Sequence, residues 1–251
     1  MTQESTPNAP VGHTGPDVRR ILDDAQRLCR QLAGPELGST PLYLIPQSQL
    51  PVGLDTKHHY AFTHPRADLM YREHITPWLG RGPCAVINDI AIEEDYGPED
   101  LEYLLHCAAL HEFAHILDRP TLYNGDDYNA ARIHFEALVL NDCSKRASPL
   151  VEVPLYYGHG PSFIRLVIHL AYRASRIGFD VRPAGIFAAH HLGLSPVCMY
   201  ADALGDEPHR CLETPLSGLL AIAPDVEFTQ QWSADMDRYD SRFSTPKEPS
   251  V

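Results

Sequence analysis

Three residues in one short segment have the types and the spacing needed for metal chemistry. His111 and His115 are four residues apart, and Glu112 follows the first of them, in the sequence HEFAH. On a helix this spacing places both imidazoles on one face, one turn apart, so that both can reach one ion. Zinc accepts neutral imidazole nitrogens at about 2.0–2.1 Å. The pattern therefore predicts a zinc site in which Glu112 takes a proton from the metal-bound water.

The residues around this motif strengthen the prediction. Those that flank it are all uncharged: Ala108, Ala109, Leu110, Phe113, Ala114, Ile116 and Leu117. Burying two histidines and a glutamate in such a helix costs free energy unless something pairs with them, and a metal ion is such a partner. The alternative is an ordinary helix whose histidines face solvent or satisfy each other.

Residues 108–117, preceded by a strand candidate at residues 84–92, resemble the zincin superfamily of metallopeptidases. In zincins, an edge strand lies antiparallel to the bound substrate just before the HExxH helix, and the order of strand and helix is the same here. The resemblance implies zinc-dependent hydrolysis of a peptide bond in a peptide or protein substrate. His111 and His115 would bind zinc, and Glu112 would act as general base and then as general acid toward the leaving amine.

A catalytic zinc needs a third protein ligand, with the fourth position left for water. The segment from His159 to Phe163 reads HGPSF, and it resembles the HGxxF segment of SprT-like and WLM-type zincins. In those families the histidine is the third ligand and opens a helix beside the active helix. Here Pro161 suits a helix start, and Phe163 can pack inward. The 44 positions between His115 and His159 are more than that family has, with an extra helix between them.

Glu136 is the second candidate for the third ligand. Gluzincins take a glutamate from the next helix, roughly twenty residues beyond the second histidine, and Glu136 lies 21 positions after His115. The gluzincin pattern has Asn just before this glutamate and Asp four residues after it, whereas this chain has Phe135 and Leu140. We expect His159 as the ligand, and Glu136 then remains a candidate to hydrogen-bond a ligand histidine.

The elements that must position these residues follow from apolar periodicity and from turn signals. Strands are predicted at residues 41–46, 59–63 and 84–92. Helices are predicted at residues 17–33, 98–118, 126–146, 161–177, 183–191, 196–204 and 208–220, the first ended by Gly34 and Pro35. A few early strands followed by many helices predict an α+β fold. We expect it to be zincin-like, with a small N-terminal sheet packed on the active-site helix and a mostly helical C-terminal half.

The chain of 251 residues fits a single large domain, predicted at residues 17–235 between a flexible leader (1–16) and a flexible tail (236–251). Its formal net charge of −13 disfavours a nucleic-acid partner, because the protein repels phosphate backbones. No apolar stretch is long enough for a membrane helix, and no signal peptide is evident, so we expect a cytoplasmic protein. The six cysteines form no CxxC pair and are expected to be free thiols.

Two other readings of the motif remain open. The first is a zinc hydrolase that acts on a non-peptide substrate, because the motif activates water and does not specify the bond to be cleaved. The second is a catalytically inactive binding protein with a zincin-like fold. Metal content separates the second reading from both hydrolase readings.

Overall fold

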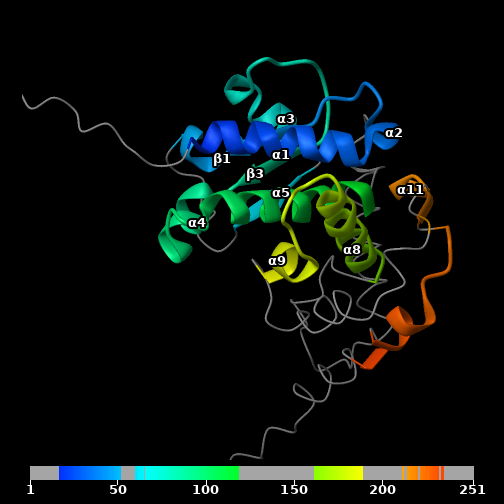
Figure 1. Ribbon diagram of the computed structural model, residues 1–251. Coiled ribbons are helices and arrows are strands. Elements are labelled where there is room, and N and C mark those ends of the chain that lie inside the picture. The colour runs from blue at the N-terminus through cyan, green and yellow to red at the C-terminus, as the bar shows by residue number, and fades with distance from the viewer. Residues whose placement is uncertain are drawn as a thin grey trace, which may run out of the picture.

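The computed structural model describes residues 17–51, 60–64, 66–118, 161–188, 211, 214–219, 221–231 and 233–234 (Figure 1). Within these ranges the chain combines a small sheet with many helices, as the predicted α+β class requires. Several predictions concern residues outside the described ones: the leader, the tail, the helices at 126–146 and 196–204, and the two third-ligand candidates, His159 and Glu136.

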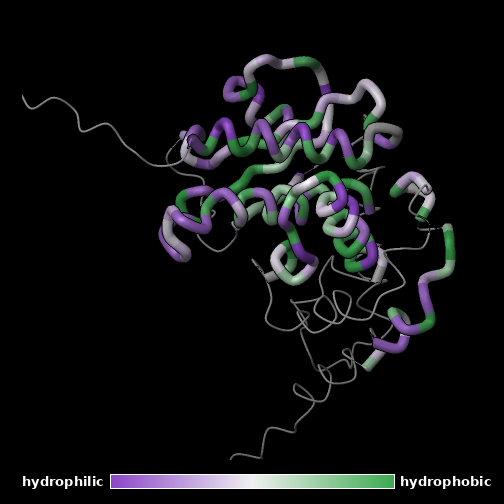
Figure 2. Tube along the Cα trace, viewed as in Figure 1, coloured by the Kyte–Doolittle hydropathy of each residue, from purple (hydrophilic) through white to green (hydrophobic). Residues whose placement is uncertain are grey.

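The first helix, α1 (Val18–Leu32), begins where the sequence predicts. Asp17 caps it by accepting a hydrogen bond from the backbone N–H of Arg20 at 3.2 Å, which satisfies one of the free donors of the first turn. Hydrophilic and hydrophobic residues alternate along α1 in Figure 2, as expected for a helix with one buried face. The helix stops at Ala33, but residues 34 and 35 do not end helical structure. They open a short helix, α2 (Gly34–Leu37), because proline fits the first turn.

Within the described residues the sheet has three strands in the order β1-β3-β2. These are β1 (Tyr43–Pro46), β2 (Ala61–Thr63) and β3 (Cys84–Ile87). β1 runs parallel to β3, and β2 runs antiparallel to it. The strand before the motif helix therefore pairs on both sides, which differs from the edge strand that the zincin resemblance implies at this position. Among the described strands, β2 is the antiparallel edge strand.

The prediction of a strand over residues 84–92 is correct only as far as Ile87. The Asn88 side chain accepts a hydrogen bond from the N–H of Ala91 at 3.1 Å and caps α4 (Asp89–Tyr96). The apolar residues at 90 and 92 therefore belong to a helix. Gly97, at φ 84°, ends α4 in a left-handed conformation that favours glycine.

Each face of the sheet is covered. Leu44, Ala85 and Ile87 face α1 and α5 (Leu101–Asp118), whereas the alternate residues face a segment that contains α3 (Ala67–Met70) and the 3-10 helix η2 (Arg72–His74). Another 3-10 helix, η1 (Gln47–Gln49), follows β1.

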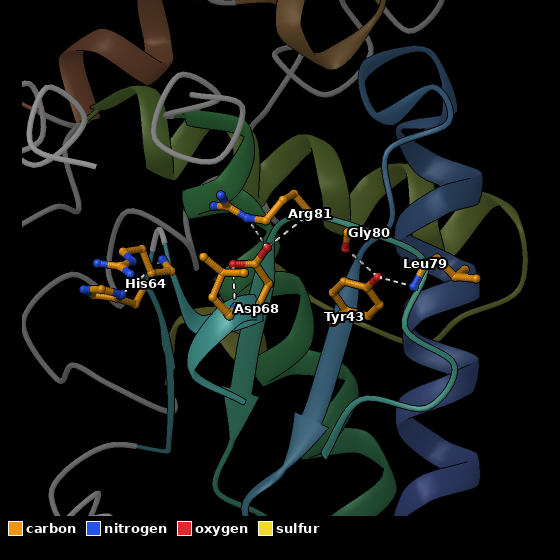
Figure 3. Close-up of polar contacts among 9 residues, drawn as sticks. Tyr43, His64, Asp68, Leu79, Gly80 and Arg81 are labelled. Atoms are coloured by element: carbon orange, nitrogen blue, oxygen red, sulfur yellow. Dashed lines mark hydrogen bonds and ion pairs between the residues drawn. The ribbon is translucent and has the colours of Figure 1, made fainter. Parts of the chain in front are cut away.

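Polar contacts attach the covering segment to the sheet (Figure 3). The buried carboxylate of Asp68 accepts hydrogen bonds from Arg81 Nε at 2.7 Å and from the N–H of Gly82 at 3.1 Å. The Tyr43 hydroxyl donates to the carbonyl of Gly80 and accepts from the N–H of Leu79, both at 2.9 Å. These contacts hold the loop that leads into β3.

The later helices pack against α5, which runs through the middle of the molecule (Figure 1). They are α8 (Pro161–Arg176), α9 (Pro183–Ala188) and α11 (Leu216–Leu219). α8 confirms the helix predicted at 161–177, and Gly178 follows it at φ 94°. The prediction at 183–191 is confirmed through Ala188. Of the helix predicted at 208–220, the described residues contain α11, and residues 226–231 form a further helical segment.

Two further predictions bear on the described residues. Cys29, Cys84, Cys107 and Cys211 are free cysteines, as expected. A search of the described helices found none with the length and hydropathy of a membrane-spanning segment.

Candidate metal centre

The residues of the HExxH motif all lie on α5, as predicted. His111 and Glu112 are buried, and His115 is half-buried. The two imidazole rings have centroids 5.0 Å apart and planes at 75°. Two imidazoles bound to one ion at about 2.0–2.1 Å, with a roughly tetrahedral angle between them, have centroids about 5 Å apart. The pair therefore has the separation that a shared zinc ion requires.

The position of the proton on His111 follows from its hydrogen bond. His111 Nδ1 lies 3.2 Å from the backbone carbonyl oxygen of Ile186 in α9. A carbonyl oxygen can only accept, so Nδ1 must carry the hydrogen. In the neutral ring, Nε2 then holds the lone pair that a metal takes. Zinc-binding histidines usually donate their other ring N–H to such an acceptor, so the arrangement at His111 fits a zinc ligand.

Glu112 is a carboxylic acid in an apolar environment. It follows Leu105 by seven residues and Ala108 by four, so it continues the stripe of α5 that packs against the sheet. Burial raises its pKa from 4.5 to about 8, and no described charge or hydrogen-bond donor offsets that shift. Without a nearby cation, Glu112 is therefore mostly protonated at pH 7. A bound divalent ion would favour the carboxylate form instead.

Phe163 connects α8 to the metal motif. Its ring stacks on His115 with a centroid distance of 4.2 Å and meets His111 edge-on at 5.0 Å. The side chain is fully buried, which confirms the prediction that it packs inward. The N-terminal turn of α8, which begins at Pro161, therefore lies against the two histidines.

One part of the site was not predicted. Sequence reasoning gave no role to residues beyond Arg182, yet Ile186 supplies the carbonyl that holds His111. Phe187 also contacts the His111 ring, with centroids 5.9 Å apart. A backbone carbonyl is present at every residue, so its use as an acceptor leaves no signal in residue type. The 75 positions between His111 and Ile186 also hide the contact from local patterns.

The described residues contain two predicted ligands and the predicted base. Among them, no group of three His, Cys, Asp or Glu side chains could hold a metal ion. Neither candidate for the third ligand, His159 or Glu136, belongs to the described set.

No family model, curated protein or solved structure matches this chain. The functional argument therefore depends on the geometry of the HExxH segment and on the elements that surround it.

Proposed function

We propose that this chain is a zincin-type, zinc-dependent hydrolase that cleaves peptide bonds. The observation that carries the proposal is the pair of imidazoles 5.0 Å apart beside a buried glutamate. An apolar helix that buries these groups is unfavourable unless a cation compensates them. The hydrogen bond from His111 Nδ1 to the Ile186 carbonyl supports the same reading, because zinc-binding histidines usually donate one ring N–H to such an acceptor.

Each residue of the motif has one task in this proposal. His111 and His115 bind zinc through ring nitrogens. Zinc, when bound, is a Lewis acid that lowers the pKa of a coordinated water to about 7. Glu112 would accept the proton of the attacking water as its oxygen bonds to the carbonyl carbon, and would then deliver that proton to the nitrogen of the leaving amine as the C–N bond breaks. The carboxyl group returns to its starting state when the products leave.

We propose His159 as the third ligand, with Glu136 as the alternative. His159 precedes Pro161, the first residue of α8, by two positions. Two residues of chain span at most about 7 Å. Phe163 in the first turn of α8 stacks on His115, so the helix start is close enough for a residue just before it to reach the ion.

The peptide substrate is proposed from the edges of the sheet. The outer edge of β1 is poorly suited to pairing, because the N–H of Leu44 donates to Gln26 Oε1 and Pro46 has no N–H. β2 differs, because its pairing with β3 directs the backbone groups of Ala61 away from β3. β2 also packs on α5. An extended peptide that pairs with this edge would lie beside the metal helix.

Zinc content tests the proposal directly. We expect elemental analysis of purified protein to find a single zinc ion per chain, and to find none in His111→Ala. His159→Ala should also abolish zinc binding, whereas Glu136→Ala should weaken affinity by about 10–100-fold if that side chain only supports a ligand. His74→Ala is the matched control, because η2 covers the opposite face of the sheet from α5.

Two outcomes would decide against parts of this proposal. Wild-type protein that binds no zinc even when zinc is supplied would rule out a metallohydrolase and favour an inactive binding protein. Zinc lost from Glu136→Ala but retained by His159→Ala would exchange the roles of the two candidate ligands.

A further inference from the structure

A stripe along α5 leads to the first zinc-binding histidine. Tyr103, Cys107 and His111 are four residues apart in turn, so they lie one above another on the same face of the helix. α9 lies along this stripe. Its residue Gly185 is placed over Tyr103 and Cys107, and the next residue, Ile186, supplies the carbonyl that meets His111.

Gly185 leaves room for side chains of α5 beneath α9. A Cβ atom at this position would lie 1.9 Å from the Tyr103 hydroxyl oxygen and 3.2 Å from Cys107 Sγ. Cβ atoms essentially never come within 3.0 Å of a non-bonded heavy atom, so any side chain here would force α9 or Tyr103 to move. The absence of a side chain at Gly185 therefore lets α9 and the Tyr103 side chain keep their observed positions.

Two side chains of α5, Tyr103 and Cys107, lie beneath Gly185. Cys107 is buried, and burial raises the pKa of its thiol to about 12. It lies one helical turn before His111. Gly185 of α9 therefore packs directly on the two side chains that precede His111 along this face of α5.

We propose that α9 is a positioning element for the ligand His111, seated on Tyr103 and Cys107 through Gly185. In that position, the Ile186 carbonyl selects the tautomer with the hydrogen on Nδ1, so that Nε2 carries the lone pair that a metal would take. Gly185 and Tyr103 are positioning residues that act through Ile186. The zinc part of this inference rests on the proposed function, whereas the tautomer of His111 does not.

The physical reason is the equilibrium between the two forms of a neutral imidazole. Either ring nitrogen can carry the hydrogen, and a ring with the hydrogen on Nε2 has no lone pair there for a metal. A well-placed acceptor at Nδ1 holds the ring in the binding form and fixes its orientation. Losing such an outer contact typically costs about 10–100-fold in metal affinity.

Gly185→Ala tests the inference in two ways. In metal-free protein, long-range ¹H–¹⁵N NMR of the histidine rings should show His111 with its hydrogen on Nδ1 in the wild type. Gly185→Ala should reduce the population of that form. The zinc dissociation constant, measured by competition with a chelator, should rise about 10–100-fold in the same variant.

Gly97→Ala is the matched control. Gly97 has φ 84° with open space around its Cβ position, so alanine strains the backbone there without touching α9. We expect it to lower stability while the His111 tautomer and the zinc dissociation constant stay unchanged. A merely structural role for Gly185 would give the same pattern in both variants, and that result would overturn the proposal.

The wild-type spectrum tests the inference even if Gly185→Ala does not fold. His111 with its hydrogen on Nε2 in metal-free protein would overturn the positioning role, whatever the protein does with zinc. A protein that binds no zinc but keeps the Nδ1 hydrogen and loses it in Gly185→Ala would reject the proposed function and support the role of α9.

Discussion

Glu112 is buried and has a raised pKa, which suits the role proposed for it of accepting and then releasing a proton. Its side chain lies on the sheet-facing stripe of α5, where burial raises its pKa to about 8. A catalytic acid or base works best when its pKa is near the working pH. The apolar helix thus provides a carboxyl group that a nearby cation can switch to its basic form.

Replacing Glu112 by Gln separates catalysis from metal binding. The amide keeps the shape of the side chain but cannot accept the proton from water. We expect Glu112→Gln to retain zinc by elemental analysis and to cleave a quenched peptide library about 10²–10⁴-fold more slowly than wild type. Equal cleavage rates in the two proteins would exclude Glu112 as the general base. Loss of zinc from the variant would instead show that Glu112 helps to bind the ion.

The same carboxyl group predicts how the stability of the metal-free protein depends on pH. Its folded pKa of about 8 exceeds the ordinary value of 4.5, so between these values the folded state keeps a proton that the unfolded state releases. The contribution of Glu112 to the free energy of unfolding is therefore complete below pH 4.5 and is lost as pH rises through the folded pKa. The loss is at most about 1.4 kcal/mol per pH unit.

Urea unfolding between pH 5 and about 9 measures this effect. The unfolding free energy of wild type minus that of Glu112→Gln should decrease as pH rises. It should stop decreasing above the folded pKa of Glu112. Other titrating groups cancel in the comparison. Parallel pH profiles for the two proteins would mean that Glu112 is not buried as a neutral acid.

At the scale of elements, α5 packs against several partners at once. One stripe of α5 packs on the sheet, another packs against α8, and a third contacts α9. The polar residues of the motif therefore face different neighbours. Glu112 continues the sheet-facing stripe, whereas His111 and His115 face Phe163 of α8. A single helix thus brings the proposed base and the two proposed ligands to the boundary between three elements.

Substitutions at Phe163 test the packing contact between α8 and α5. Removing its fully buried ring leaves a cavity against both histidines, and Phe163→Ala should lower the free energy of unfolding by about 3–5 kcal/mol. Phe163→Leu is the matched control, because it keeps most of the apolar volume, and it should cost clearly less. Thermal or urea unfolding of the three proteins in metal-free buffer measures both effects. Similar stability of Phe163→Ala and wild type would show that α8 does not depend on this contact.

At the scale of the whole molecule, the candidate site joins parts of the chain that are far apart in sequence. The sheet comes from the N-terminal half, the motif helix from the centre, and α8 and α9 from beyond residue 160 (Figure 1). β1, β3 and α1 lie on one side of α5, with α8 and α9 on the other. The net charge of −13 favours a partner without a phosphate backbone, in keeping with the proposed peptide substrate.

Local features of the chain were readable from the sequence because they depend on short-range physics. Asp17 caps α1 through its own side chain, and the four-residue spacing of His111 and His115 places them together on any helix. Phe163, in the segment that resembles HGxxF, was also expected to pack inward, and its side chain is fully buried. The α+β class followed from the order of such segments.

The tertiary structure alone decided the features that depend on distant partners. Residues 84–92 suit a buried strand or a buried helix equally well by apolar pattern, and the cap at Asn88 divides them between β3 and α4. The central place of β3 depends on which strands pair with it, and no local spacing encodes that choice. The Ile186 carbonyl meets His111 across 75 positions of sequence, and a backbone acceptor becomes specific only through its position in space.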